Sequence, residues 1–179
     1  MIKGNFISLK SIEKYDVPRL YELYMEASGG MLNTTYEEVN LGNFIFELYG
    51  SENEKNSSKV FCIIYEKDII GFITLVDIKS VNRSANVGHL VIGKEFRGNK
   101  YSIDSVITLI KHSFNNLNLH RIDCYIYGDN YKMGKDFFKH IPGALHEGTN
   151  REWGYRNGEW IDRHTWSLLR KDFFRERED

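Results

Sequence analysis

The chain has little proline, and its charges almost cancel. Only two prolines, Pro18 and Pro142, occur in 179 residues, so no Pro-rich linker separates one part of the chain from another. The formal net charge is −1, which excludes a strong overall field that would attract nucleic acid or an anionic membrane. We therefore expect a single domain over residues 1–179, with no nucleic-acid partner and no membrane partner.

Cysteines and long apolar runs are also scarce. The two cysteines, Cys62 and Cys124, each lie inside a strand-like run, as small buried residues do in a reducing compartment. Their spacing matches no metal motif, so we expect no metal. The first ten residues lack the apolar centre of a secretion signal, and no run is long enough to span a bilayer. A cytoplasmic protein is the expectation.

What the sequence does contain is a clear alternation of strand and helix patterns. Apolar spacing and turn residues predict the order β-α-α-β-β-β-α-β-α-β-β, which is one mixed α/β sheet with helices on its faces. Strands are expected at 5–12, 59–66, 69–78, 82–93 and 120–128, with two more within 144–173. Helices are expected at 13–27, 34–50, 102–117 and 129–141.

Local signals support several of these elements. Thr35 and Glu38 form a capping-box pattern at the start of the second helix. Lys67-Asp68 reads as the two-residue turn of a hairpin, and Arg156-Asn157-Gly158 as the turn between the closing strands. The segment 102–117 has the strongest helix signal, because its apolar residues recur on one face.

The segment "EFRGNKYS", residues 95–102, lies between the apolar run "GHLVIG" and the predicted helix 102–117. A strand, a basic glycine turn and a helix start in this order are suited to holding phosphate. Backbone N–H groups of such a turn converge on an anion, and the helix dipole favours negative charge there. An ordinary surface turn is the alternative interpretation of the same residues.

With the elements in this order, the chain resembles the GCN5-related N-acetyltransferase (GNAT) family, and within it the ribosomal-protein N-terminal acetyltransferase type. The resemblance covers roughly residues 5–171 and rests on four ordered segments: "IIGFITL", "NVGHLVIGKEFRGNKYSID", "NLNLHRIDCYIYGDN" and "LHEGTNREWGYRNGEWIDRHTWSLLRKDF". It implies a mostly antiparallel central sheet flanked by helices, in which the fourth and fifth strands splay apart to admit acyl-CoA. It also implies acetyl transfer from acetyl-CoA to a primary amine, either a protein N-terminus or a small amine, directly within a ternary complex.

The resemblance further implies how the chain would bind acetyl-CoA. Backbone groups of Leu90, Val91 and Ile92 would bond the pantetheine arm and polarise the thioester carbonyl. Asn130 matches the family asparagine that contacts the pantetheine amides, although a helix cap is the other interpretation. Phe137 would pack against the arm. The pyrophosphate would lie on the turn formed by Arg97, Gly98, Asn99, Lys100, Tyr101 and Ser102.

This turn departs from the family pattern Gln/Arg-x-x-Gly-x-Gly/Ala at two positions. Glu95 stands at the Gln/Arg position, and Lys100 stands where a second small residue is usual. The Lys100 side chain would either clash with the diphosphate or supply positive charge to a phosphate of CoA. We favour the second interpretation, because the turn needs its N–H groups more than it needs the absence of a Cβ.

The resemblance leaves the acid and base open. Phe137 and Met133 occupy the positions where relatives carry a tyrosine or serine acid, so water would protonate the departing thiolate. Candidate bases are Glu147, Glu152, His89 and Asp77, with amine deprotonation through a water chain as the alternative.

The acceptor amine would lie between the first two helices and the closing hairpin, near aromatic and acidic residues that suit a cation. These residues are Tyr21, Tyr24, Tyr36, Trp153, Tyr155, Trp160, Glu22, Glu26, Glu37 and Glu38. Two other functions stay open: a catalytically idle relative that binds acyl-CoA or a partner protein, and transfer of a longer acyl group. Homodimers are common in the family, and a homodimer is compatible with this chain.

Overall fold

The chain forms one eight-stranded sheet in the order β1-β2-β3-β4-β5-β6-β8-β7. The structure is a computed structural model that describes residues 1–27, 44, 57–156 and 158–175. The strands are β1 (Ile2–Lys3), β2 (Ser8–Ser11), β3 (Lys59–Tyr65), β4 (Asp68–Lys79), β5 (Ser84–Ile92), β6 (Arg121–Tyr127), β7 (Ala144–Arg156) and β8 (Glu159–Leu169). Neighbouring strands are antiparallel except for β5 and β6, which are parallel.

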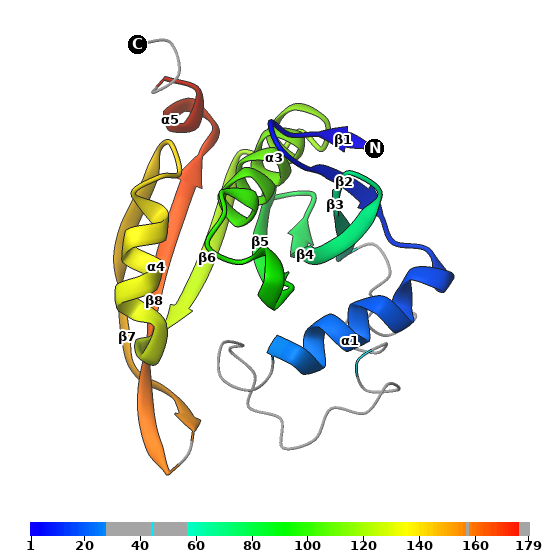
Figure 1. Cartoon of the computed structure of the whole chain (residues 1–179). Coiled ribbons are helices and arrows are strands. Elements are labelled where there is room, and N and C mark those ends of the chain that lie inside the picture. Colours follow the sequence, from blue (N-terminus) through cyan, green and yellow to red (C-terminus); the bar gives the residue numbers. More distant parts are fainter. Residues whose placement is uncertain (28–43, 45–56, 157, 176–179) are drawn as a thin grey trace.

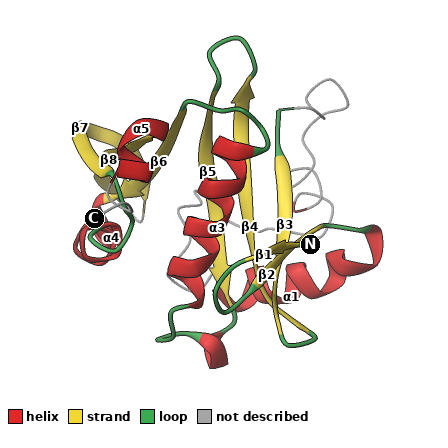
Figure 2. Cartoon of the chain, turned by 90° about the horizontal axis from the view of Figure 1, so that it is seen from above, coloured by secondary structure: helices red, strands yellow, loops and turns green. Residues whose placement is uncertain are grey.

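Helices cover both faces of this sheet (Figures 1 and 2). The described helices are α1 (Val17–Ala27), α3 (Tyr101–Asn115), α4 (Tyr131–Phe138) and α5 (Arg170–Arg175). One apolar core joins α3, α4 and α5 to the sheet and includes Phe114, Phe138 and Phe173. A second core lies between α1 and the strands β3 to β5 and includes Leu20, Tyr24 and Phe72.

The pair β5 and β6 is joined over only part of its length. The parallel register runs from Ser84↔Arg121 to Val87↔Cys124. Beyond that point β5 continues to Ile92 and β6 to Tyr127 without pairing to each other. The sheet therefore opens into a V, and one edge of the last part of β5 faces the gap.

The start of α3 is fixed by a buried carboxylate. The Asp104 side chain accepts hydrogen bonds from the backbone N–H groups of Asn5, Phe6 and Ile7 at 3.0, 2.7 and 3.1 Å. Hydrogen bonds from N–H groups to a charged acceptor are stronger than neutral ones. The N-terminal segment thus holds the first turn of α3, which begins beside the gap.

The mixed α/β fold and the splayed strands are confirmed. One turn differs from the prediction: the hairpin turn is Glu66-Lys67, because Asp68 pairs with Tyr65 and belongs to β4. Glu66 takes a positive φ of 55° to make that turn. The helix predicted at 34–50, with its Thr35 and Glu38 pattern, lies outside the described residues except for Phe44.

Candidate active site

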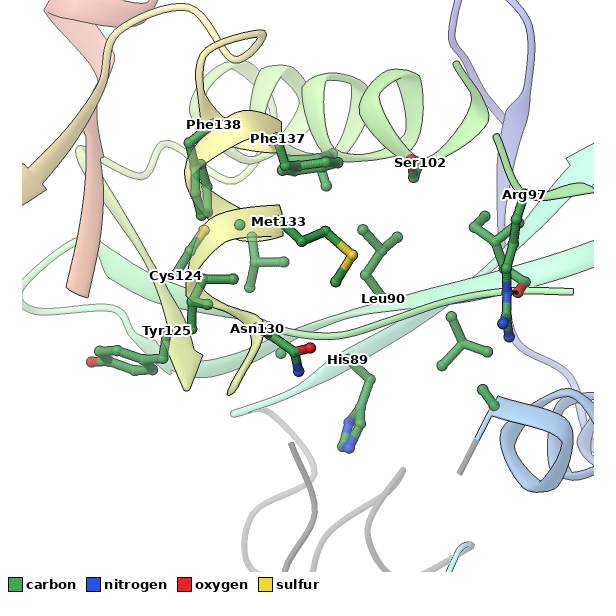
Figure 3. A pocket seen from close by; sticks show the side chains of 18 of the residues that line it. His89, Leu90, Arg97, Ser102, Cys124, Tyr125, Asn130, Met133, Phe137 and Phe138 are labelled. Atoms are coloured by element: carbon green, nitrogen blue, oxygen red, sulfur yellow. Dashed lines mark hydrogen bonds between the residues drawn. The ribbon is translucent and has the colours of Figure 1, made fainter. Parts of the chain in front are cut away.

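A cavity of about 560 Å³ occupies the gap between β5 and β6. Its walls come from four places: the end of β5, the end of β6, the turn before α3, and α4 (Figure 3). The predicted site residues that line it are His89, Leu90, Val91, Ile92, Arg97, Gly98, Asn99, Ser102, Asn130 and Phe137. Lys100, Tyr101, Glu147 and Glu152 do not line it.

A β-bulge shapes the β5 wall. The register of β4 and β5 shifts so that Thr74 alone lies opposite Gly88 and His89. The His89 backbone N–H donates to Thr74 Oγ1 at 2.8 Å. Bulges turn side chains away from the regular alternation, and here the bulge directs His89 to the α1 face, where its ring centroid lies 6.0 Å from that of Tyr24.

The backbone of β5 alternates between its paired and its open edge. The Val91 carbonyl lies against Gly71 of β4, and the Gly93 N–H donates to Ile70 O at 2.8 Å, so both groups face β4. Strand residues alternate in the direction of their backbone groups, which places those of Leu90 and Ile92 at the open edge. The prediction for Val91 is therefore wrong, since its backbone groups face the sheet instead of the cavity.

Of the two open-edge residues, Ile92 already has a partner. Its carbonyl accepts a hydrogen bond from Arg97 Nε at 2.9 Å. This bond draws the Arg97 side chain back onto β5, so the cation and the strand end form one wall of the cavity (Figure 3). Leu90 is the remaining predicted residue whose backbone groups face the gap, and among the described residues they have no hydrogen-bond partner on that side.

The turn after β5 has the geometry of an anion site. Gly98 adopts φ +79°, which side chains rarely permit, and nothing lies within 4 Å of the place a Cβ would take. The N-terminus of α3 carries no side-chain cap among the residues described. Because the first N–H groups of a helix lack intrahelical acceptors, those at the start of α3 can receive an anion.

Lys100 and Tyr101 belong to this turn but not to the cavity wall. Lys100 is the exposed N-cap residue of α3, with φ −77° and ψ 6°. Its Cβ therefore does not prevent the turn from forming. The Tyr101 ring packs on Tyr65 with centroids 4.7 Å apart, and their hydrogen bond raises the Tyr101 pKa. Each contributes at most its backbone to the turn.

Helix α4 supplies the opposite wall. Asn130 precedes the helix, and its side chain makes no capping hydrogen bond. The helix cap, which was the other interpretation of Asn130, is therefore not formed by its side-chain amide. Phe137 and Met133 project from α4 into the cavity (Figure 3). Both are apolar, and neither can donate a proton.

His89 is the predicted base that the structure places at the cavity. Its ring lies between Tyr24 and Phe72, with centroid distances of 6.0 and 6.4 Å. Burial lowers the pKa of His89 from its usual value, because the charged imidazolium loses hydration there. The imidazole is therefore neutral near pH 7 and can accept a proton.

The two glutamates predicted as bases lie elsewhere. Glu147 accepts two hydrogen bonds from Arg121, at 2.9 and 2.7 Å, and one from Ser167 at 2.6 Å. Arg121 and Ser167 lower the Glu147 pKa to about 2, which makes it a poor base. Glu152 is exposed, lies in a bulge of β7 and lines a different hollow. Neither is brought to the cavity.

Asp77, the remaining candidate base, is engaged on β4. It takes a positive φ of 52° and accepts a hydrogen bond from Asn86 Nδ2 at 2.7 Å. It does not line the cavity. The structure therefore leaves His89 as the candidate that faces the gap.

The acceptor-side residues are only partly brought together. On α1, Tyr24 is buried, Glu22 pairs with Arg19, and Glu26 accepts the Lys94 N–H at 3.0 Å. Trp153, Tyr155 and Trp160 are exposed on the β7–β8 hairpin. Tyr36, Glu37 and Glu38 lie outside the described residues.

Sequence reasoning missed an aromatic stack beside the cavity. Tyr125 of β6 lines the cavity, and the guanidinium of Arg163 lies 4.4 Å from its ring centroid. The Trp153 ring centroid lies 3.6 Å from the same guanidinium. Alternate residues of the predicted strands 120–128 and 144–173 would have placed Tyr125 and Arg163 on one face, but only the structure shows the bulge that brings Trp153 over them.

No described helix is long and apolar enough to cross a membrane. No group of three or more histidine, cysteine, aspartate or glutamate side chains in that part of the chain is arranged to hold a metal ion.

Comparison with known proteins shows relatives along most of the chain. The family model for the acetyltransferase (GNAT) domain matches residues 7–136. YdaF of Bacillus subtilis strain 168, which is named provisionally as a ribosomal N-acetyltransferase, is 30% identical over 62% of this chain. That match spans 59% of YdaF. The spermidine N(1)-acetyltransferase of Vibrio cholerae is 24% identical over 87% of this chain and 88% of its own length.

Solved structures agree on the fold. The crystal structure of the Vibrio cholerae spermidine N-acetyltransferase in complex with CoA and spermine superposes with a TM-score of 0.83 at 20% identity. The superposition covers 96% of this chain and 99% of that one. The superposition agrees on the fold, and the family model matched over residues 7–136 shows that the chain belongs to the GNAT family of N-acetyltransferases.

Proposed function

We propose that this protein transfers the acetyl group of acetyl-CoA to a primary amine, directly within a ternary complex, in the gap between β5 and β6. The observation that carries the proposal is the end of the β5–β6 pairing at Val87↔Cys124, with a cavity of about 560 Å³ in the gap beyond it. A strand edge without a partner can bond an extended amide chain as a further strand would. The pantetheine arm of CoA is such a chain.

The groups around the gap suit the parts of acetyl-CoA in order. The glycine turn and the start of α3 receive the pyrophosphate through backbone N–H groups, with Arg97 as the nearby cation. The Asn130 amide meets the pantetheine amides, and Phe137 packs against the arm. The Leu90 N–H points to the open edge, where it stabilises the negative charge that develops on the thioester oxygen.

The reaction forms a bond between the amine nitrogen and the acetyl carbon and breaks the bond between that carbon and sulfur. The nitrogen loses a proton, and the thiolate of CoA gains one. The neutral His89 is positioned to accept the first proton, directly or through water. Met133 and Phe137 offer no proton to the sulfur, so water supplies the second.

One observation favours an idle acyl-CoA-binding protein as the second candidate. The two cavity positions where relatives of this type carry an acid are apolar here. Against it stands the neutral His89, which lines the cavity. The two candidates differ in turnover and not in binding.

Thiol release from acetyl-CoA across a panel of amines separates these candidates. The panel includes polyamines, amino acids and short peptides, and an acetylated product is identified by mass. Turnover with at least one amine supports the enzyme. Acetyl-CoA binding without thiol release from any amine would instead favour the idle relative.

Replacing Asn130 with alanine tests the cofactor side. The variant should bind acetyl-CoA roughly tenfold more weakly, because a hydrogen bond to a buried amide is lost. Its melting temperature should stay near that of the wild type, since the Asn130 side chain caps no helix. An unchanged affinity would remove Asn130 from the site.

A further inference from the structure

The guanidinium of Arg163 contacts two aromatic rings on the face of the sheet that contains Tyr125. The Tyr125 and Trp153 ring centroids lie 4.4 and 3.6 Å from its central carbon. Cation–π contacts of this kind are worth about 0.5–2 kcal/mol each. These two contacts hold the guanidinium in place before any ligand arrives.

The protein builds this stack at the expense of regular pairing in β7. The register of β7 and β8 shifts between Asn150 and Gly154, so three residues oppose Asp162 alone. Glu152 takes a positive φ of 51° in this bulge, and its N–H donates to Asp162 Oδ1 at 2.8 Å. Backbone held in this region costs energy and persists where surrounding structure demands it. The next residue along the bulge is Trp153, which covers Arg163.

Arg163 lacks the counter-ion that its neighbour on the same face has. Arg121 is paired with both Asp123 and Glu147. For Arg163, by contrast, no carboxylate of the described residues forms an ion pair. Its Nη2 makes one long hydrogen bond of 3.4 Å to Asn150 Oδ1, and its Nε is buried without a partner. A guanidinium has five N–H donors, so most of the hydrogen-bonding capacity of Arg163 is unused.

Three carboxylates of β4, β6 and β7 are bound elsewhere, while Glu152 lines the other hollow beside Trp153. Asp123 and Glu147 serve Arg121, and Asp77 accepts from Asn86. Among the described residues no carboxylate pairs with Arg163, so its charge can bind an anion that a ligand carries. A carboxylate is the partner that a planar guanidinium fits best, because two parallel N–H···O bonds can form.

The position of the stack indicates which molecule would carry that carboxylate. Tyr125, which forms one side of the stack, lines the cavity in the gap, and its hydroxyl points outward at the cavity rim (Figure 3). Trp153 and Asn150, which both contact Arg163, line a second hollow with Thr149, Arg151 and Glu152. Arg163 therefore lies one ring away from the proposed reaction gap.

We propose that Arg163 selects an acceptor that carries a carboxylate as well as the reacting amine, such as an amino acid or a peptide with a free carboxyl group. The inference rests on the proposed function, since it names the class of acceptor for the same site. Arg163 binds the carboxylate while the amine reaches the thioester. Arg163 acts in recognition and takes no part in proton transfer.

The kinetic test uses matched acceptors that differ only in the carboxylate. Straight-chain ω-amino acids from glycine to 6-aminohexanoate are compared with 1-aminoalkanes of equal length, with spermidine as a carboxylate-free polyamine. We expect the wild type to prefer an amino acid of one length by roughly 10- to 100-fold in kcat/KM, as a charge-assisted bond would give. Arg163→Gln should abolish this preference through KM and leave the alkylamine rates within about twofold.

Two further variants separate recognition from a structural role. Arg163→Lys should keep part of the preference, because lysine keeps the charge but cannot form two parallel hydrogen bonds to a carboxylate. Arg151→Gln removes an exposed arginine of the same hairpin that lies outside the stack, and it should leave the preference unchanged. Equal losses with both acceptor series in Arg163→Gln, or a wild-type preference for spermidine, would overturn the proposal.

A second readout does not depend on turnover. The side-chain N–H resonance of Arg163 can be identified in a nitrogen-15 spectrum by its absence in Arg163→Lys. We expect it to shift as the best ω-amino acid is added and to stay in place as the matched alkylamine is added. If no amine releases thiol but this resonance shifts, the proposed function fails while the carboxylate site stands. If thiol is released and the resonance does not shift for either ligand, the carboxylate site is wrong.

Discussion

At the scale of single residues, the structure separates candidate bases that their chemical type alone does not separate. Three carboxylates and one histidine were equally good candidate bases from the sequence. In the structure Glu147 accepts hydrogen bonds from Arg121 and Ser167, and Asp77 accepts one from Asn86. The sequence does not show such long-range pairing, since Glu147 and Arg121 are 26 residues apart. His89 is distinguished by a bulge that no pattern in the sequence predicts.

Replacing His89 with glutamine should lower kcat/KM by about 100-fold if His89 accepts the amine proton, while the affinity for acetyl-CoA stays the same. The wild type should lose activity on acidification as His89 protonates, at a pH below its usual pKa. This acidic limb should be absent in the variant. A pH profile of thiol release checks the prediction, and an identical acidic limb in both proteins would contradict it.

His89 also affects how the stability of the protein depends on pH. The pKa of His89 is lower in the folded state than in the unfolded state, so the unfolded chain binds more protons near and below pH 6.5. Stability therefore falls as pH decreases from 7 to 5. Denaturant unfolding should show a weaker pH dependence in His89→Gln than in the wild type, and an equal dependence would count against burial as the cause.

Glu147→Gln should behave as a structural substitution. Its side chain is 36% exposed, and surface ion pairs contribute about 1 kcal/mol or less. We expect a loss of stability within that range in urea unfolding, with kcat within about twofold of the wild type. A tenfold loss of kcat in a folded variant would return Glu147 to the catalytic candidates.

At the scale of elements, the periodicity of apolar residues predicted helices and strands better than it predicted the roles of single residues. The helix at 102–117 is observed as α3 (Tyr101–Asn115), since Val106, Ile110 and Phe114 repeat on one buried face. The glycine turn before it was identified because glycine and a basic residue lie between a strand and a helix. The direction of backbone groups along β5 could not be predicted, because it depends on the bulge at Gly88 and His89.

The close packing of α4 on β6 gives a prediction at this scale. A Cβ on Gly134 would lie 2.9 Å from three side-chain atoms of Ile126, which is closer than real contacts permit. Gly134→Ala should therefore cost about 1–3 kcal/mol in unfolding free energy. It should also weaken acetyl-CoA binding, because α4 carries Met133 and Phe137.

The partner residue supplies the control for that change. In the double variant Gly134→Ala with Ile126→Ala, the atoms that cause the overlap are absent. Its unfolding free energy and acetyl-CoA affinity should exceed what the two single variants predict by addition. Simple additivity would show that the overlap does not shift α4.

The charge of Lys100 at the start of α3 gives the next prediction. Lys100→Ala should weaken acetyl-CoA binding by about two- to fivefold at low salt, since an exposed attraction between a lysine and a phosphate is worth about 0.2–1 kcal/mol. The difference should shrink in 0.5 M salt through screening, to roughly the wild-type value. Calorimetric titration at both salt concentrations measures it. Tighter binding by the variant would support the alternative, in which the side chain obstructs the phosphates.

At the scale of the whole molecule, the order of elements and four short segments were enough to predict the splayed sheet. That order determines which strands neighbour each other, and a crossover through α3 makes β5 and β6 parallel. The acceptor site was less predictable. It depends on how the closing hairpin presents Trp153 and Arg163, and part of the expected site lies in residues that the structure does not describe.

The central claim is that the open edge of β5 binds acetyl-CoA, and calorimetric titration of acetyl-CoA into the wild type and Leu90→Pro tests it most directly. Proline removes the N–H that faces the gap, while the neighbouring bonds to β4 are kept. We predict saturable binding at one site per wild-type chain and at least roughly tenfold weaker binding by a variant of near-native melting temperature. No binding to the wild type at millimolar acetyl-CoA, or equal affinity in the folded variant, would contradict the account.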